Sequence, residues 1–145
     1  MLHEEITSVV TAANYVVYNT LGYGFLEKGY ENALILELQK RGLSVKQQMP
    51  IKVYYEGHVV GEYCADLLVN DAVIVELKAV EQIIKSHEFQ VVNYLKATEI
   101  EIGLILNFGP KPEFKRKIFS NTRKPGLKGV SNPDYIKAEK NKKNP

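Results

Sequence analysis

The sequence predicts an α/β fold in a single domain. Two segments with helical spacing of apolar residues open the chain, extended segments follow them, and a strand, a helix and a strand succeed one another after residue 71. A chain of 145 residues suits one domain with one core. The strand–helix–strand order favours a right-handed crossover, which makes its two strands parallel.

Residues 4–20 form the first expected helix, because apolar residues recur there at spacings of about three and four. Glu4 and Glu5 lie in its first turn, where the helix dipole favours acids. The stretch LGYG at 21–24 interrupts the pattern. The second helix is expected at 25–41, and Gly42 is typical of the position just past a helix end.

The extended segments come next. Residues 43–57 predict two extended pieces hinged near Pro50, and 58–69 predict a further strand. Asn70 and Asp71 are turn residues that lead into a strand at 72–80. A helix at 81–99 and an aliphatic strand at 100–109 complete the order ααββββαβ, and residues 114–120 fit a short edge strand.

The composition narrows the class of protein. Hydrophobic residues make up 45% and charged residues 25%, the balance of a soluble globular protein. No run of about 18 apolar residues occurs, so no membrane span is expected. The first ten residues carry acids where a signal peptide would carry bases. The single cysteine, Cys64, excludes an internal disulfide and favours a cytoplasmic, reduced protein.

Charge is distributed unevenly along the chain. Residues 111–145 hold eleven Lys/Arg and three Asp/Glu, a balance of +8, whereas residues 1–110 have a balance of −6. We expect a domain at 1–120 and a basic, weakly ordered tail at 121–145. The basic end favours contact with a polyanion, although a solubilising tail explains it equally well. The residues expected to contact nucleic acid are Lys111, Lys115, Arg116, Lys117, Arg123 and Lys124.

The strand AVIVELKAV at 72–80 carries an unusual charged pair. Glu76 and Lys78 are two residues apart, so they lie on the same face of an otherwise apolar strand. Such a pair is costly on a covered face unless it is paired, hydrated or bound to a metal. The simplest alternative is an ion pair on a solvent-exposed face of the strand. Neighbouring residues help to distinguish this alternative from a functional site.

Asp66 on the preceding strand is the most informative neighbour. A two-residue loop at 70–71 would pair Asp66 with Val75 and place it on the opposite face, whereas a three-residue loop at 70–72 would pair it with Glu76. Two adjacent carboxylates repel unless a cation lies between them or one keeps its proton. Hard oxygen ligands favour Mg²⁺ or Mn²⁺, and an adjacent lysine suits the activation of water.

Two helical segments add further candidates. Glu27 and Tyr30 share a face in GFLEKGY at 24–30, although a carboxylate near a helix start also has a purely structural explanation. Gln90 and Tyr94 share a face in HEFQVVNYL at 87–95, where an ordinary half-buried polar patch is the alternative. His87 fits a structural or surface histidine better than a ligand.

Taken in order, these motifs resemble the PD-(D/E)XK nuclease superfamily, and within it the GxxExxY branch. The resemblance rests on Gly24-x-x-Glu27-x-x-Tyr30, Asp66, Glu76-x-Lys78 and Gln90-x-x-x-Tyr94, and it covers roughly residues 4–120. One departure is Ala65, where the superfamily often has a proline before its aspartate.

The resemblance implies a restriction-endonuclease-like core, with a mixed central sheet flanked by helices. By motif, Asp66, Glu76 and the backbone carbonyl of Leu77 match metal ligands, with Glu27 a possible addition, and Lys78 matches the lysine that orients the attacking water. Glu27, Tyr30, Gln90 and Tyr94 match the residues that support the site.

The function implied is Mg²⁺- or Mn²⁺-dependent hydrolysis of nucleic acid, with DNA favoured over RNA and a homodimer suited to cutting both strands of a duplex. Two alternatives stay open. One is an inactive nuclease-like fold that binds nucleic acid or a protein, and the other is a purely structural partner protein.

Overall fold

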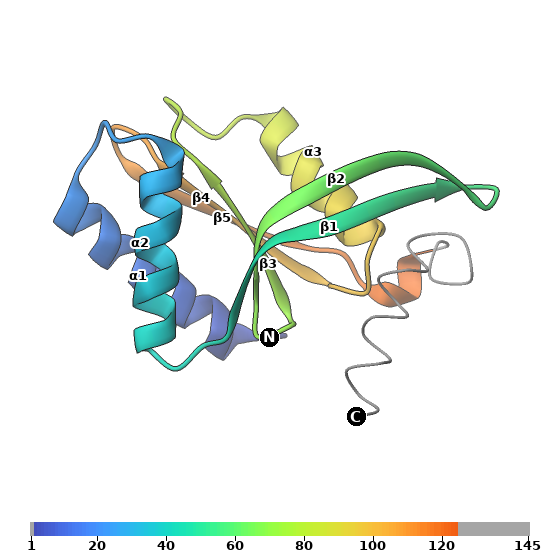
Figure 1. Ribbon diagram of the computed structural model, residues 1–145, viewed down its shortest axis with the longest axis horizontal. Helices are drawn as coiled ribbons and strands as arrows, with labels where there is room; N and C mark the ends of the chain where they lie inside the picture. The colour runs from blue at the N-terminus through green and yellow to red at the C-terminus, as the bar shows by residue number, and fades with distance from the viewer. Residues whose placement is uncertain (1, 125–145) are drawn as a thin grey trace.

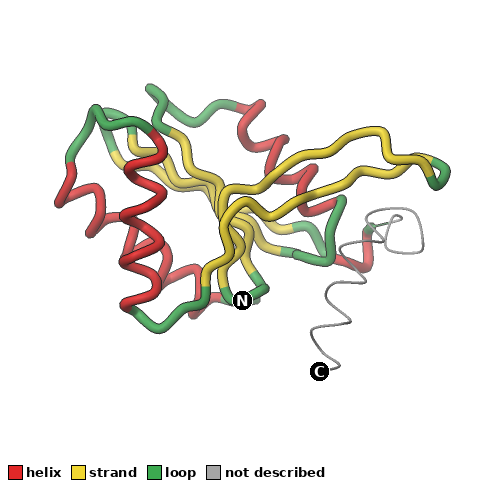
Figure 2. Tube along the Cα trace, viewed as in Figure 1, coloured by secondary structure: helices red, strands yellow, loops and turns green. Residues whose placement is uncertain are grey.

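The computed structural model describes residues 2–124, which form a five-stranded mixed sheet in the order β1-β2-β3-β4-β5. Helices α1 and α2 cover one face and α3 covers the other, as Figures 1 and 2 show. The predicted α/β fold with a mixed sheet and flanking helices is confirmed. The elements are α1 (Glu4–Leu21), α2 (Glu27–Lys40), β1 (Val45–Tyr55), β2 (His58–Val69), β3 (Val73–Lys78), α3 (Lys85–Lys96), β4 (Ile102–Phe108), β5 (Pro112–Ile118) and the short 3₁₀ helix η1 (Asn121–Arg123).

Most of the predicted tail, residues 125–145, lies outside the described part of the chain. The first four residues of the predicted tail are described: Asn121–Arg123 form η1, and Lys124 follows them. The predicted edge strand at 114–120 is present as β5, which pairs antiparallel with β4. No helix among residues 2–124 is long and apolar enough to cross a membrane.

The hinge predicted near Pro50 is wrong, because β1 runs through this residue as one strand. Pro50 pairs with Cys64 on β2, and a proline is tolerated there because β1 is an edge strand. The irregularities lie elsewhere in the strand: Gln48 has a φ of 54° and the register shifts between Val53 and Tyr54. The far half of the β1–β2 hairpin extends beyond the rest of the sheet (Figure 1).

The β2–β3 connection has the predicted three-residue loop. Val69 pairs with Val73, so the loop consists of residues 70–72, and the register continues to Leu67 opposite Val75. Asn70 and Asp71 have φ angles of 51° and 53°, a left-handed conformation that these two residue types tolerate well. This register places Asp66 and Glu76 on the same face of the sheet.

The crossover from β3 to β4 is also as expected, since the two strands are parallel. The helix within it is shorter than the predicted 81–99, because side chains hold the segment before it in a non-helical form. The Val80 amide donates to Asn107 Oδ1 at 3.0 Å, and the Ile83 amide donates to Glu113 Oε1 at 3.1 Å. Gly103 then admits α3 against the sheet, because a Cβ there would lie 2.5 Å from Val91 Cγ1.

Candidate active site

Asp66 and Glu76 occupy the point where β2 and β3 separate. Regular pairing ends at Leu67 and Val75, and beyond it each carboxylate accepts a hydrogen bond from the backbone of the opposite strand. The Asp66 amide donates to Glu76 Oε1 at 2.8 Å, and the Leu77 amide donates to Asp66 Oδ2 at 2.8 Å. These two bonds fix both carboxylates side by side and use one oxygen of each.

The backbone is irregular on the other side of Asp66 as well. The pairing of β1 with β2 skips Gln48, which lies opposite Asp66 and has a φ of 54°. The Gln48 side chain accepts a hydrogen bond from Cys64 Sγ at 3.2 Å. A non-glycine residue with positive φ is unusual, and this one interrupts the β1–β2 pairing directly opposite Asp66.

Burial makes this carboxylate pair electrostatically demanding. Glu76 is only 4% exposed, and burial, followed by the neighbouring Asp66, raises its pKa to about 8 against the opposing effects of the Asp66 amide and Lys78. Burial also raises the pKa of Asp66, while the hydrogen bond from the Leu77 amide opposes the rise. Two carboxylates in this position therefore call for a bound proton or a cation.

The third predicted member, Lys78, lies at the end of β3 and is directed toward α3. Its ammonium donates a hydrogen bond to Gln90 Oε1 at 3.2 Å. Tyr94 lies one turn further along α3, and burial, then Glu76 and Asp66, raise its pKa to about 12. The structure thus brings Gln90 and Tyr94 to the same site as the carboxylates and the lysine.

His87, in contrast, has a local structural role. Its Nδ1 accepts a hydrogen bond from the Ile84 amide at 3.1 Å, at the start of α3. The side chain therefore helps to cap the helix.

Glu27 approaches the site from the first turn of α2. Burial, then the charge of Asp66, raises the pKa of Glu27, and Lys78 lowers it. The Glu27 carboxylate is therefore close enough for the charges of Asp66 and Lys78 to shift its pKa, although Glu27 itself is exposed. The structure therefore places Glu27 near the carboxylate pair, at the protein surface.

Tyr30 braces the loop that precedes α2. Its side chain is fully buried and stacks on Phe108 with 4.3 Å between ring centroids. Its hydroxyl donates to the Gly22 carbonyl at 2.6 Å and accepts from the Phe25 amide at 3.1 Å. Tyr30 therefore supports the site indirectly, by holding the loop that places Glu27.

We expect Tyr30→Phe to lower the free energy of unfolding by about 1–3 kcal/mol, because it removes the partner of the Gly22 carbonyl and the Phe25 amide. Urea unfolding monitored by circular dichroism measures this loss. The matched control is Tyr23→Phe, since Tyr23 is 59% exposed in the same loop. Equal stability of the two variants would contradict the role assigned to the Tyr30 hydroxyl.

Glu31 is a member of the cluster that sequence reasoning missed. It is 3% exposed, accepts hydrogen bonds from Lys28 Nζ and Gln47 Nε2 at 2.9 Å each, and raises the pKa of Asp66. The sequence feature that could have identified Glu31 is its spacing, because it lies four residues after Glu27 and therefore on the same helix face.

The donor chemistry at this site fits Mg²⁺ or Mn²⁺. Among residues 2–124, no group of three or more His, Cys, Asp or Glu side chains is arranged to hold a metal ion by itself. Mg²⁺, however, usually binds through one or two carboxylates together with waters and substrate phosphate. Asp66, which is half-buried, and Glu76, which is buried, supply two adjacent, mutually repelling carboxylates, and this donor chemistry fits such an ion.

The six basic residues predicted to contact nucleic acid have different surroundings. Arg116 Nη2 donates to the Leu2 carbonyl at 2.7 Å, and Lys117 forms an ion pair with Glu88. Both side chains are therefore engaged within the protein. The three that are exposed are Lys111, Lys115 and Arg123.

The prediction that Lys124 contacts nucleic acid is wrong, because its side chain is buried and not available to a phosphate. Its side chain is 1% exposed, and its ammonium donates to the carbonyls of Thr98 and Ile100 at 3.0 and 2.6 Å. Burial lowers the pKa of Lys124 to about 8, against the opposing charge of Glu101. Lys124 anchors the end of η1 to the α3–β4 connection.

The chain is similar to a known protein family and to solved structures. A family model described as the PD-(D/E)XK nuclease superfamily matches residues 4–117. No curated protein matches the chain. The crystal structure of SSO0001 matches with a TM-score of 0.49 and 15% identity. The match covers 80% of this chain and 59% of the SSO0001 chain. Hjc, a Holliday junction resolvase from Archaeoglobus fulgidus, matches with a TM-score of 0.40 and 15% identity over 76% of this chain and 98% of its own.

Proposed function

The chain belongs to the PD-(D/E)XK nuclease superfamily, and on that premise we propose that it is a Mg²⁺-dependent nuclease that hydrolyses phosphodiester bonds, with DNA preferred over RNA. The observation that carries the proposal is the reciprocal bonding of Asp66 and Glu76 at the β2–β3 junction, with Lys78 at the end of the same strand. Mn²⁺ is the alternative ion, since it accepts the same ligands.

In this proposal Asp66, Glu76 and the backbone carbonyl of Leu77 hold the ion, and Glu27 adds a further carboxylate at its edge. A bound Mg²⁺ supplies Lewis-acid stabilisation of the charge that develops on the phosphate. Lys78 orients the attacking water and adds positive charge near the phosphate. Gln90 accepts a hydrogen bond from the Lys78 ammonium, so it sets the direction in which that group points.

We also assign the chain to the GxxExxY branch of the superfamily, because each residue of this motif has a physical role here. Gly24 has a φ of 113°, a conformation that favours glycine. Glu27 begins α2 next to the carboxylate cluster, and the Tyr30 hydroxyl ties together the loop between the first two helices. The motif therefore positions one acid at the site.

Three exposed basic residues extend the proposal to substrate binding. Lys111, Lys115 and Arg123 are available for phosphate contacts, which predicts affinity that falls steeply with salt. We also propose a cytoplasmic location, which the single cysteine favours, and a two-fold dimer, which would present one site to each strand of a duplex.

The test is a cleavage panel. Labelled single- and double-stranded DNA and RNA are incubated with the protein and Mg²⁺, Mn²⁺ or EDTA, and products are resolved on denaturing gels. We expect cleavage with Mg²⁺ or Mn²⁺, none with EDTA, and a loss of at least about a hundredfold in Asp66→Asn. The matched control is Asp71→Asn, the same substitution in the exposed β2–β3 turn.

Cleavage that persists in EDTA or in Asp66→Asn would contradict the assignment. Metal-independent binding of nucleic acid without cleavage in any lane would favour the alternative, an inactive nuclease-like module.

A further inference from the structure

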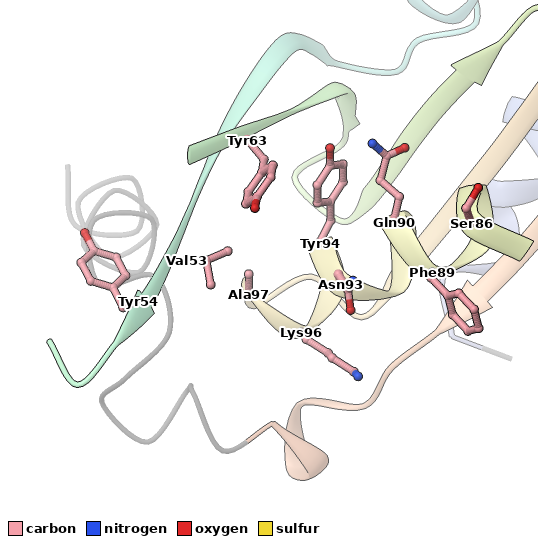
Figure 3. Close-up of a pocket in the computed structure, with 10 residues that line it drawn as sticks. All are labelled: Val53, Tyr54, Tyr63, Ser86, Phe89, Gln90, Asn93, Tyr94, Lys96 and Ala97. Carbon is pink, nitrogen blue, oxygen red and sulfur yellow. The ribbon is translucent and has the colours of Figure 1, made fainter. Parts of the chain in front are cut away.

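A cavity of about 600 Å³ lies between the β1–β2 hairpin and α3, beside the candidate active site (Figure 3). The hairpin supplies one wall, with Tyr63 from β2 and Val53 and Tyr54 from β1. Helix α3 and the residue after it supply the other wall, with Ser86, Phe89, Gln90, Asn93, Tyr94, Lys96 and Ala97. Its volume falls within the range of small-molecule binding sites.

Two residues of the cavity wall also belong to the surroundings of the carboxylate cluster. Gln90, which bonds Lys78, also lines the cavity, and so does Tyr94, whose pKa is raised by Glu76 and Asp66. Figure 3 shows Gln90 and Tyr94 side by side on α3, with Tyr63 facing Tyr94 from the hairpin. The two tyrosine rings lie 6.3 Å apart between centroids. A group seated here would therefore adjoin the phosphate held at the active site.

The lining combines exposed aromatic rings with polar groups. Tyr63 is 53% exposed and Phe89 is 63% exposed, and exposed aromatic surface in a concave site is typical of a binding surface. Asn93 and Ser86 offer hydrogen-bonding groups, and Lys96 adds a positive charge at the rim. This mixture of flat rings, hydrogen-bonding groups and one cation matches a nucleotide, whose base stacks while its phosphate stays charged.

We propose that this cavity binds one unstacked nucleobase of a single-stranded segment, next to the phosphate to be cleaved. The inference rests on the proposed nuclease function and names its substrate class. Bases inside a duplex are paired and stacked on their neighbours, so they cannot enter a cavity without first being extruded. The preferred substrate is therefore single-stranded nucleic acid or an unpaired segment within a duplex.

Binding of short oligonucleotides that contain one 2-aminopurine tests the proposal. The full chain is titrated in EDTA, so that cleavage does not interfere, and fluorescence reports stacking of the probe base. We expect quenching and tighter binding with the single strand than with the matching duplex. Tyr63→Leu and Phe89→Ala should each weaken single-strand binding about tenfold, the effect of losing one stacking partner. Both positions are exposed, so each variant should fold.

The matched control is Tyr55→Leu, since Tyr55 is 65% exposed on the same hairpin and does not line the cavity. Equal affinity for single strand and duplex would overturn the inference, as would equal losses in Tyr55→Leu and Tyr63→Leu. DNA and RNA versions of the oligonucleotide show which sugar the site accepts. Selective single-strand binding without cleavage in Mg²⁺ would contradict only the nuclease proposal, because this assay does not depend on turnover.

Discussion

Lys78→Met is expected to slow phosphodiester cleavage by about a hundredfold to ten-thousandfold while leaving nucleic-acid affinity within about threefold of the wild type. The ammonium is close enough to Asp66 and Glu76 to lower their pKa values and donates a hydrogen bond to Gln90 at 3.2 Å, so its proposed role is to orient water and stabilise charge in the transition state. Methionine keeps the length of the side chain and removes the charge. Single-turnover cleavage with saturating enzyme separates this loss from any change in binding.

The matched control is Lys40→Met, since Lys40 is exposed at the end of α2 and should cleave at the wild-type rate. Gln90→Leu provides a second readout, because it removes the acceptor that directs Lys78 and should reduce the rate less than Lys78→Met. If Lys78→Met cleaves at the wild-type rate, the proposed chemistry of the site is wrong, whatever the fate of substrate binding.

Part of the site follows from the sequence through simple geometry. Side chains alternate along a strand, so a three-residue loop at 70–72, or an equivalent bulge, is needed to place Asp66 and Glu76 on one face, and the observed register has this loop. Apolar spacing also predicts the two opening helices and the strand–helix–strand crossover, whereas the predicted split of residues 43–57 into two strands is wrong. The catalytic and metal-binding roles of these residues stay predictions.

Other features depend on contacts that a linear pattern does not contain. Lys124 belongs to a basic stretch of the sequence, yet its side chain is buried and its ammonium donates hydrogen bonds to two backbone carbonyls. Pro50 lies within an edge strand and is not a hinge. In the described sheet β1 pairs with β2 on one side, and Pro50 lies opposite Cys64. Glu31 is buried because Lys28 and Gln47 satisfy its carboxylate. In each case a distant or non-periodic partner determines where the side chain lies.

The second large effect concerns the stability of the metal-free protein. Burial, and then the charge of Asp66, raises the pKa of Glu76 to about 8 in the folded protein, well above the 4.5 of an exposed glutamate. Between these two pH values the folded state keeps a proton that the unfolded state has lost. Its contribution to stability is therefore full below about pH 4.5 and is lost as the pH rises through about 8. We expect the free energy of unfolding in EDTA to fall by a few kcal/mol across this window, since each pKa unit corresponds to about 1.4 kcal/mol.

Glu76→Gln should remove most of this slope, because the amide is neutral at every pH and its oxygen can still accept the Asp66 amide. The variant is then more stable than the wild type at pH 8 and close to it at pH 5. Urea unfolding at several pH values in EDTA measures the difference, and Glu62→Gln on the exposed part of β2 is the control. Adding Mg²⁺ at pH 8 should stabilise the wild type and not Glu76→Gln, because the ion replaces the proton between the two carboxylates. A pH slope that survives in Glu76→Gln would show that this carboxylate is not the group that titrates.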